Sequence, residues 1–344
     1  MKAPRPLSVV IVDDSPYARY VLERHLAAEG FLVLGDFGRA EEAIWAIPTL
    51  APDLVTMDVL MPGLNGIEAV RALRTRWSGS ILMVSSRTRQ GAAATWAALE
   101  AGADDFVAKP EAGCSLADVI AVVAAKGRSL VAARSAHRDP ARVGANAELA
   151  ALPGERELQL LVMGASTGGP RAVSGILAGL NGPPRIPIVI IQHMPVGFTR
   201  FFADRLAEVA GCAVRESPLD GAAIAFHPPP IVLAASGQHL HVSRSACWST
   251  PGERRHGVIP ALDVTLQDAA AAFDARLGAM VLTGMGNDGR QGAIAVRRAG
   301  GVVIAESRDT AVIWGMPRAV VEAGAASRVW PLPMIRHWLR RVVR

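Results

Sequence analysis

The chain has 344 residues, of which 51% are hydrophobic and 19% charged, and its formal net charge is +5. This composition is typical of a folded globular protein and excludes a largely disordered chain, while the length favours two domains of ordinary size. The apolar runs at residues 119–125 and 186–191 are far shorter than the roughly 18 residues that a membrane-spanning helix needs, so we expect no direct membrane insertion.

The distribution of arginines and cysteines limits which binding partners and which cellular compartment we expect for the protein. The arginines are spread along the chain without a helix-turn-helix or zinc-binding signature, so we expect no nucleic-acid partner. Cys114, Cys212 and Cys247 lack C-x-x-C spacing, and their odd number argues against a disulfide framework. The N-terminal apolar run is short and ends in two aspartates, unlike a secretion signal, so we expect a cytoplasmic protein.

The first 125 residues alternate short β-branched runs with amphipathic stretches of helical length. This alternation predicts a parallel sheet with helices on its faces. Ser15 is a candidate N-cap of the first helix, with Pro16 at the first helical position. The predicted strands of this part are residues 8–12, 31–34, 54–57, 81–84 and 105–107.

The alternation stops at residue 126 and resumes after an intervening segment. Residues 126–155 are rich in Ala, Arg and Gly, so we interpret them as an interdomain linker with some helical character. We therefore expect an α/β protein with two doubly wound parallel-sheet domains, a first at 1–125 and a Rossmann-like second at 156–344. The predicted strands of the second domain are residues 158–163, 188–191, 231–234, 279–282 and 302–305.

Charged and small polar residues stand at the carboxyl ends of the strands predicted in the first domain. In chain order these are Asp13 and Asp14, Asp58, Ser85, and Lys109. Such strand ends share one edge of a doubly wound sheet. Three carboxylates at one edge repel each other unless a hard cation such as Mg²⁺ bridges them, and a lysine adds a compact positive charge. One aspartate alone would be an ordinary loop residue, but the ordered set favours a phosphoryl-transfer site.

The motifs VVIVDDS, DLVTMDVLMPGLNGIEAV, MVSS and DDFVAKP resemble those of the response-regulator receiver domain along nearly the full first 120 residues. The resemblance implies that Asp58 accepts a phosphoryl group from a partner histidine kinase. It also implies that Asp13, Asp14 and Asp58 hold Mg²⁺. The residues implied in sensing the new charge are Ser85, Phe106 and Lys109, with Phe106 as the aromatic side chain that changes its packing.

The segment GASTGG at residues 164–169 follows an apolar run and fits the pattern G-x-S-x-G. Between a strand and a helix, such a turn either exposes a nucleophilic serine or presents backbone N–H groups to a phosphate. A nucleophilic Ser166 requires a histidine base and an acid that orients it, and His193 and Asp288 follow other predicted strands of the same sheet. The order Ser, His, Asp differs from that of α/β-hydrolases, so we do not expect that fold family.

The segment GMGNDG at residues 284–289 supplies glycines that would let backbone N–H groups approach a developing oxyanion. Two other histidines, His239 and His241, alternate along a probable strand. They have no further metal-ligating residues nearby in the sequence, so we interpret both as structural.

The second domain resembles the catalytic domain of the chemotaxis protein-glutamate methylesterases, the CheB family, in VMGASTGGPRAV, IIQHMPVGFTRFFADRL, VLTGMGNDGRQGAIAVRRAGG and WGMPRAVVEAGAA. The resemblance implies hydrolysis of glutamate methyl esters, and deamidation of certain glutamines, on the cytoplasmic part of methylated chemoreceptors. The implied site residues are Ser166, His193 and Asp288 as the triad, with Thr167 or Met285 near the oxyanion. It implies no cofactor for the hydrolytic step, and a receiver domain that covers the cleft until its aspartate is phosphorylated.

Three segments depart from the pattern of that family: AASGQH at 234–239, IPALD at 259–263 and AESRD at 305–309. None of them includes the triad, so the expected chemistry stands while the choice of glutamyl site stays open. Two alternatives remain. One is a signalling module whose hydrolase domain has lost turnover, and the other is a nucleotide-binding domain that uses GASTGG as a phosphate loop. Gln192 and His193 stand where the nucleotide-binding pattern expects an acidic residue.

Overall fold

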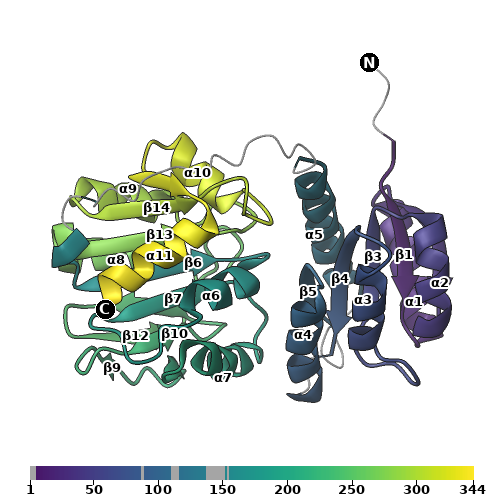
Figure 1. Ribbon diagram of the computed structural model, residues 1–344, viewed down its shortest axis with the longest axis horizontal. Helices are drawn as coiled ribbons and strands as arrows, with labels where there is room; N and C mark the ends of the chain where they lie inside the picture. Colours follow the sequence, from purple (N-terminus) through teal and green to yellow (C-terminus); the bar gives the residue numbers. More distant parts are fainter. Residues whose placement is uncertain (1–4, 87–88, 110–115, 137–151, 153–154) are drawn as a thin grey trace. The chain divides into compact units, whose positions relative to one another are not determined.

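The computed structural model describes residues 5–86, 89–109, 116–136, 152 and 155–344. The chain divides into two compact units, Met1–Arg138 and Asp139–Arg344. Each unit has a parallel sheet with helices on both of its faces (Figure 1), which confirms the predicted fold class. None of the helices within the described residues is both long and apolar enough to cross a bilayer.

The first unit contains a five-stranded sheet with the order β2-β1-β3-β4-β5, in which every neighbouring pair is parallel. Its strands are β1 (Ser8–Val12), β2 (Leu32–Phe37), β3 (Leu54–Asp58), β4 (Ser80–Ser85) and β5 (Asp105–Ala108). Every residue of β1, β3, β4 and β5 is buried, as expected for strands covered on both faces. Strand β2 is an edge strand and half-buried.

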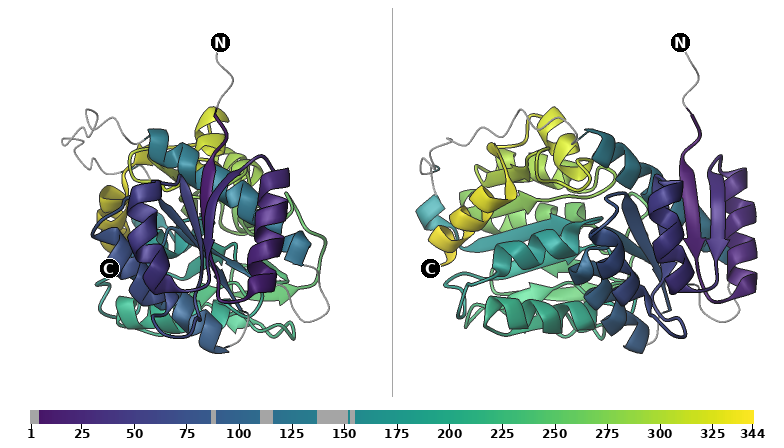
Figure 2. Two further views of the ribbon diagram at one scale, coloured as in Figure 1. Left: turned by 90° about the vertical axis from the view of Figure 1, so that its right-hand side faces the viewer. Right: turned by 45° about the vertical axis from the view of Figure 1, so that its right-hand side comes forward.

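Helices α1 (Pro16–Ala28) and α5 (Leu116–Ala136) contact each other on one face of this sheet. Helices α2 (Ala40–Leu50), α3 (Gly66–Arg74) and α4 (Arg89–Ala101) form the opposite layer (Figure 2). Local signals set their starts. The Ser15 hydroxyl accepts a hydrogen bond from the N–H of Ala18, with Pro16 at the first helical position. Asn65 forms a capping box with Glu68 at the start of α3.

Two boundaries of the first unit differ from the prediction by more than one residue. Strand β2 extends to Phe37 instead of ending at residue 34, because Gly35 and Asp36 interrupt the apolar run while their backbone still pairs with β1. Helix α5 continues past residue 125 to Ala136. Its alanines favour a helix, and Leu130 and Val131 are buried. Of the predicted linker, residues 137–151, 153 and 154 lie outside the described residues.

The second unit contains a seven-stranded parallel sheet with the order β15-β14-β13-β6-β7-β10-β8. Its strands are β6 (Leu160–Ala165), β7 (Ile188–Gln192), β8 (Val214–Glu216), β10 (Ile231–Leu233), β13 (Leu277–Val281), β14 (Val302–Glu306) and β15 (Arg328–Trp330). A three-stranded antiparallel sheet consists of β9 (Ile224–Ala225), β11 (His239–Val242) and β12 (Ala246–Thr250). Of these strands, only β11 was predicted, as the probable strand that carries His239 and His241.

Helices α6 (Gly169–Leu177), α7 (Thr199–Ala210) and α11 (Leu332–Val343) cover one face of the large sheet, and α8 (Leu262–Phe273), α9 (Arg290–Arg298) and α10 (Met316–Glu322) cover the other (Figure 1). Strand β6 lies between β7 and β13. The strands that follow β6 first extend the sheet on its β7 side, and β13, β14 and β15 then extend it on the other side, so the direction of winding reverses at β6. The edge beyond its carboxyl end is therefore a topological switch point, where ligands bind in open α/β sheets.

Candidate functional site

In the first unit, the predicted acidic residues meet at the carboxyl edge of the sheet. Asp13 follows β1 directly, and Asp58 is the last residue of the neighbouring strand β3. Lys109 follows β5, and its Nζ lies 2.8 Å from Asp13 Oδ2 and 2.6 Å from Asp58 Oδ2. Asp13 and Asp58 are buried, whereas Asp14 is exposed. The three aspartates each offer a carboxylate oxygen, all within 4.8 Å of one another.

The electrostatics of this cluster suit a site that binds more positive charge. Burial raises the pKa of Asp58, and nearby Asp13 adds to the increase while Lys109 opposes it. Burial alone would lower the pKa of Lys109, but the two carboxylates hold it above its ordinary value. Asp13 Oδ2 is buried, and its close partner among the described residues is Lys109 Nζ at 2.8 Å. Carboxylate oxygens that lie as close together as those of the three aspartates fit a divalent cation.

The predicted switch residues lie beside this cluster. Ser85 is the last residue of β4 and is fully buried, and its hydroxyl donates a hydrogen bond to the carbonyl of Gly91 at 3.1 Å. Phe106 lies within β5 and is 2% exposed, with its ring edge-on to Trp96 at 6.3 Å and Lys126 Nζ 5.7 Å from its centre. The structure thus places both residues in the core, and their role in switching stays a prediction.

In the second unit, the predicted triad lies at three adjacent strand ends. Ser166 directly follows β6, and His193 directly follows the neighbouring strand β7. Asp288 lies in the loop after β13, the neighbour of β6 on its other side. His193 Nε2 lies 2.8 Å from Asp288 Oδ2, and both side chains are more than nine-tenths buried. No hydrogen bond joins the Ser166 hydroxyl to His193 within the described residues.

Asp288 is fixed by the beginning of helix α8. Its Oδ2 accepts the N–H of Leu262 at 2.6 Å, and its Oδ1 accepts the N–H groups of Asp263 at 3.0 Å and Gly289 at 2.9 Å. The free N–H groups of a helix N-terminus favour a negative charge at this position. Burial alone would raise the pKa of Asp288, but His193 and these backbone donors together hold it below its ordinary value. The carboxylate is therefore ionised opposite the imidazole.

The turn between β6 and α6, which contains Ser166, is held by backbone contacts from both sides. The N–H of Ser166 donates to the carbonyl of Thr283 at 3.0 Å, and its own carbonyl accepts Nε2 of Gln192 at 2.9 Å. Gln192 Nε2 also donates to the carbonyl of His193 at 3.1 Å, which ties the serine and histidine backbones together. A Cβ on Gly284 would lie 2.9 Å from the Cβ of Ser166, so only glycine allows this approach.

Donors for an oxyanion are available next to Ser166. Thr167 is 1% exposed and follows Ser166 directly, at the start of helix α6. Neither its backbone N–H nor its hydroxyl oxygen has a hydrogen-bond partner in the part of the chain that the structure describes. Met285, the other candidate, is 42% exposed beside the same turn. Within the described residues, the structure thus leaves a backbone N–H without an acceptor directly after Ser166, at the positive end of a helix.

Several side chains of the site were not predicted. Asp263 lies in the altered segment 259–263 and is 2% exposed beside Asp288. Its Oδ2 lies 2.9 Å from His256 Nε2, and its Oδ1 accepts the N–H of Gly292 at 2.7 Å. Burial raises the pKa of Asp263, and the charge of Asp288 also contributes. The departure of this segment from the family pattern was the only sequence signal.

The two histidines that we interpret as structural, His239 and His241, both form contacts within the second unit. His239 Nε2 lies 2.7 Å from the carbonyl of Glu253, and its Nδ1 accepts the N–H of Ala261 at 3.2 Å. His241 pairs with Asp268 at 2.6 Å. His239 therefore joins β11 to the loop before α8, and His241 joins β11 to helix α8 itself.

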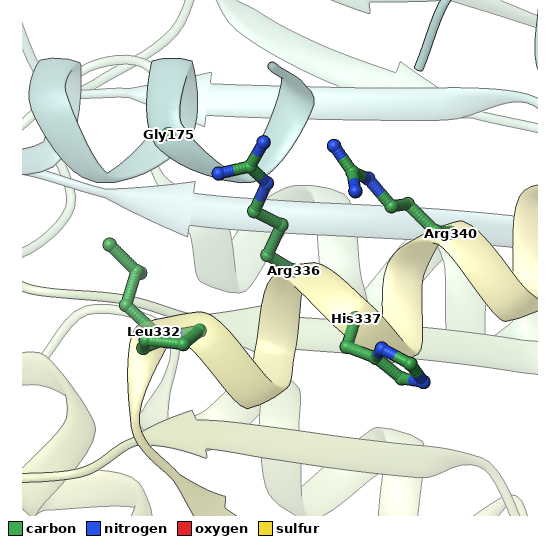
Figure 3. Close-up of a pocket in the computed structure, with 6 residues that line it drawn as sticks. Gly175, Leu332, Arg336, His337 and Arg340 are labelled. Atoms are coloured by element: carbon green, nitrogen blue, oxygen red, sulfur yellow. The ribbon is translucent and has the colours of Figure 1, made fainter. Parts of the chain in front are cut away.

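A hollow of about 470 Å³ lies between α6 and α11. Figure 3 shows Arg336 and Arg340 turned toward α6 and His337 turned away from it. Both guanidinium groups donate to the carbonyl of Ala178, at 3.1 and 2.7 Å. Ala178 caps the carboxyl end of α6. Positive groups at a helix C-terminus stabilise its free carbonyls, so these arginines have a structural role.

Comparison with known proteins finds a family match for each of the two units. Residues 161–339 match the family described as CheB methylesterase, and residues 9–121 match the response regulator receiver domain. The chain is 37% identical to a protein-glutamate methylesterase/protein-glutamine glutaminase of Symbiobacterium thermophilum, with 98% of each chain covered. It is 35% identical to the protein of the same name from Thermotoga maritima, over 95% of this chain and 96% of that one. The crystal structure of the Thermotoga maritima CheB methylesterase catalytic domain has 37% sequence identity and a TM-score of 0.49, covering 54% of this chain and 99% of that chain.

Proposed function

The chain belongs to the CheB methylesterase family and carries a receiver domain, and on that basis we propose that it removes methyl groups from glutamate side chains of chemoreceptors and deamidates receptor glutamines. The observation that supports this best is that Ser166 and the buried His193–Asp288 pair follow three adjacent strands at one edge of the sheet. Ester hydrolysis and deamidation are both acyl transfers to water, so one set of groups serves both.

In the proposed reaction, the Ser166 hydroxyl attacks the side-chain carbonyl carbon while His193 takes its proton. Asp288 occupies Nε2 of the imidazole, so Nδ1 is the nitrogen that receives this proton. His193 then protonates the leaving methanol, or ammonia for a glutamine substrate. A water molecule, deprotonated by the same nitrogen, releases glutamate from the acyl-serine. The ionised Asp288 stabilises the imidazolium that forms in each half of the cycle.

The tetrahedral intermediate carries an oxyanion that needs hydrogen-bond donors. We assign this role to the backbone N–H of Thr167, which has no acceptor within the described residues and lies at the amino end of α6. The helix dipole adds a favourable field at that position. A donor fixed before the reaction begins contributes more than a mobile water molecule, because it needs no reorganisation as the charge develops.

The first unit would act as the regulatory part. We propose that Asp58 accepts a phosphoryl group from a histidine kinase and that this modification activates the hydrolase. Asp13, Asp14 and Asp58 are the residues that would hold Mg²⁺, which would neutralise charge on the phosphoryl group. Lys109 contributes a second positive charge at 2.6 Å from Asp58. The hydrolytic step needs no cofactor in this proposal.

We also assign the enzyme to the cytoplasm. A kinase donor and the cytoplasmic part of a receptor would both be available there. The two cysteines within the described residues, Cys212 and Cys247, are free thiols, as expected in a reducing compartment.

The experiment that tests the proposal measures methanol release from a methyl-esterified receptor by the wild type and by Ser166→Ala. Each protein is assayed with and without a small phosphodonor and Mg²⁺. We expect release that the phosphodonor stimulates in the wild type and that the substitution abolishes. Turnover by Ser166→Ala would refute the assignment of the nucleophile. No release from the wild type, despite phosphorylation of Asp58, would favour a signalling module or a different ester substrate.

A further inference from the structure

Glu306 is a buried carboxyl group that the proposed reaction does not use. It is the last residue of β14 and its side chain is 0% exposed. None of the described residues forms an ion pair with it. Its partners are hydrogen-bond donors only: the N–H of Thr283 lies 2.8 Å from Oε2, and the hydroxyl of Thr310 lies 2.9 Å from Oε1. An unpaired carboxyl group in a core is costly and calls for a reason.

The position of Thr283 supplies that reason. The parallel pairing of β13 with β14 ends at Val281 and Ala305, so no strand partner remains for the N–H of Thr283. Glu306 provides the missing acceptor with its side chain and so extends the hydrogen bonding of the sheet beyond the end of the strands. An N–H group at this depth without an acceptor would be destabilising.

Thr283 fixes the backbone of the turn that contains Ser166 and Thr167. Its carbonyl accepts the N–H of Ser166 at 3.0 Å, and its hydroxyl donates to the carbonyl of Thr167 at 2.9 Å. The same hydroxyl accepts the N–H of Ile313 at 2.9 Å. One buried threonine therefore fixes the backbone of the serine and of the residue whose N–H we assign to the oxyanion.

We propose that Glu306 is a positioning residue for the hydrolase reaction, which holds Thr283 and through it sets the backbone of Ser166 and Thr167. This inference depends on the proposed function, because it requires Ser166 to be the nucleophile. Glu306 does not touch the reacting atoms. Its effect is to keep the hydroxyl of Ser166 and the N–H of Thr167 in their relative positions, and a small displacement of such groups lowers turnover more than binding.

The test compares kcat and KM for methanol release by the full chain with phosphodonor and Mg²⁺. Glu306→Ala is expected to lower kcat on the order of 10- to 100-fold while KM changes by less than about twofold. Glu306→Gln keeps an oxygen that accepts the N–H of Thr283 and should recover most of kcat. Glu155→Gln is the matched control. Glu155 is also a buried glutamate of the second unit, but it binds Trp338 and Arg341, and its substitution should leave both constants unchanged.

Two further variants decide the question if Glu306→Ala does not fold. Thr283→Val removes the hydroxyl that holds Thr167 but keeps the backbone N–H and carbonyl, and Thr283→Ser restores a hydroxyl. We expect the valine variant to lose kcat and the serine variant to regain it. Wild-type kcat in Glu306→Ala or in Thr283→Val would overturn the inference, as would a Glu306→Gln variant as slow as Glu306→Ala.

Ser166→Ala, assayed in parallel, separates the two proposals. Turnover by Ser166→Ala refutes the proposed function itself. An inactive Ser166→Ala together with full activity in the Glu306 variants refutes only the role of Glu306.

Discussion

Glu306 also makes the stability of the second unit depend on pH in the neutral range. Burial raises the pKa of this group from 4.5 to about 7. Because the folded-state pKa is the higher one, the stabilising contribution is complete below pH 4.5 and is lost as the pH rises to 7. Between pH 5 and pH 8 the wild type should lose roughly 2–3 kcal/mol of unfolding free energy relative to Glu306→Gln, which has no such proton.

Chemical denaturation of both proteins at several pH values measures this difference. The two curves of unfolding free energy against pH should diverge between about pH 5 and pH 7 and run parallel above about pH 7. Parallel curves over the whole range would mean that Glu306 keeps an ordinary pKa in the folded protein.

Asp288 is predicted to orient the imidazole of His193 and to stabilise its protonated form by its negative charge. In Asp288→Asn, the amide cannot accept all the hydrogen bonds of the carboxylate and no longer stabilises an imidazolium. We expect kcat to fall on the order of 10³- to 10⁴-fold. The matched control is Asp268→Asn, since Asp268 pairs with His241 at 2.6 Å on the small sheet and takes no part in the proposed reaction.

The measurement is methanol release by each variant under conditions that phosphorylate Asp58. The control should retain kcat within about twofold of the wild type. A loss of similar size in both variants would show that His–Asp pairs in this unit act on folding and not on the chemistry.

At the level of elements, the turn between β6 and α6 depends on a close approach of two backbones. A methyl group on Gly284 would meet the Cβ of Ser166 at 2.9 Å and would also press against Met316. Gly284→Ala should therefore displace the nucleophile and lower kcat at least tenfold. Gly175→Ala is the control, because the nearest atom to its new methyl group would be Leu332 Cδ2 at 3.8 Å. This variant should keep its activity and gain about 0.5–1 kcal/mol of stability from helix propensity.

Activity and thermal unfolding of both glycine variants check this expectation. The Gly175→Ala protein should melt at or above the temperature of the wild type. Full activity in Gly284→Ala would mean that the loop after β13 can move away from Ser166 without cost.

Sequence reasoning could assign three candidate residues to one edge of a sheet because strands and their ends have strong local signals. Apolar runs of the right length placed β6, β7 and β13, and the residues that follow such runs in a parallel sheet must share an edge. Ser166, His193 and Asp288 could therefore be assigned to one edge before any contact was known. The fold class followed from the same alternation of strands and helices.

The supporting contacts could not be predicted in the same way. Glu306 accepts an N–H from a residue 23 positions earlier in the chain, and Asp263 donates its own N–H to Asp288, which lies 25 positions later. Contacts between a side chain and a distant backbone have no periodicity, and they depend on where each strand stops. The end of β2 was missed for a related reason, since Gly35 and Asp36 lack an apolar pattern although their backbone is paired.

In the whole molecule, each candidate site is built from one unit. The carboxylate cluster of the first unit is built on β1, β3 and β5, and the proposed triad of the second is built on β6, β7 and β13. Under the proposed function, a change in one site should therefore leave the chemistry of the other intact. Only the proposed response of the hydrolase to phosphorylation requires both units.

Asp58→Asn tests this division of roles. The amide cannot be phosphorylated, so the phosphodonor should no longer stimulate methanol release, while unstimulated release should stay within about twofold of the wild type. Asp53→Asn is the matched control, because Asp53 lies directly before the same strand. Asp53 precedes the first residue of β3 and binds Arg5 and Ser8, whereas Asp58 ends that strand among the other acidic residues. Stimulation should persist in Asp53→Asn. If stimulation persists in Asp58→Asn as well, the phosphodonor acts at another residue and the first unit does not regulate the hydrolase through Asp58.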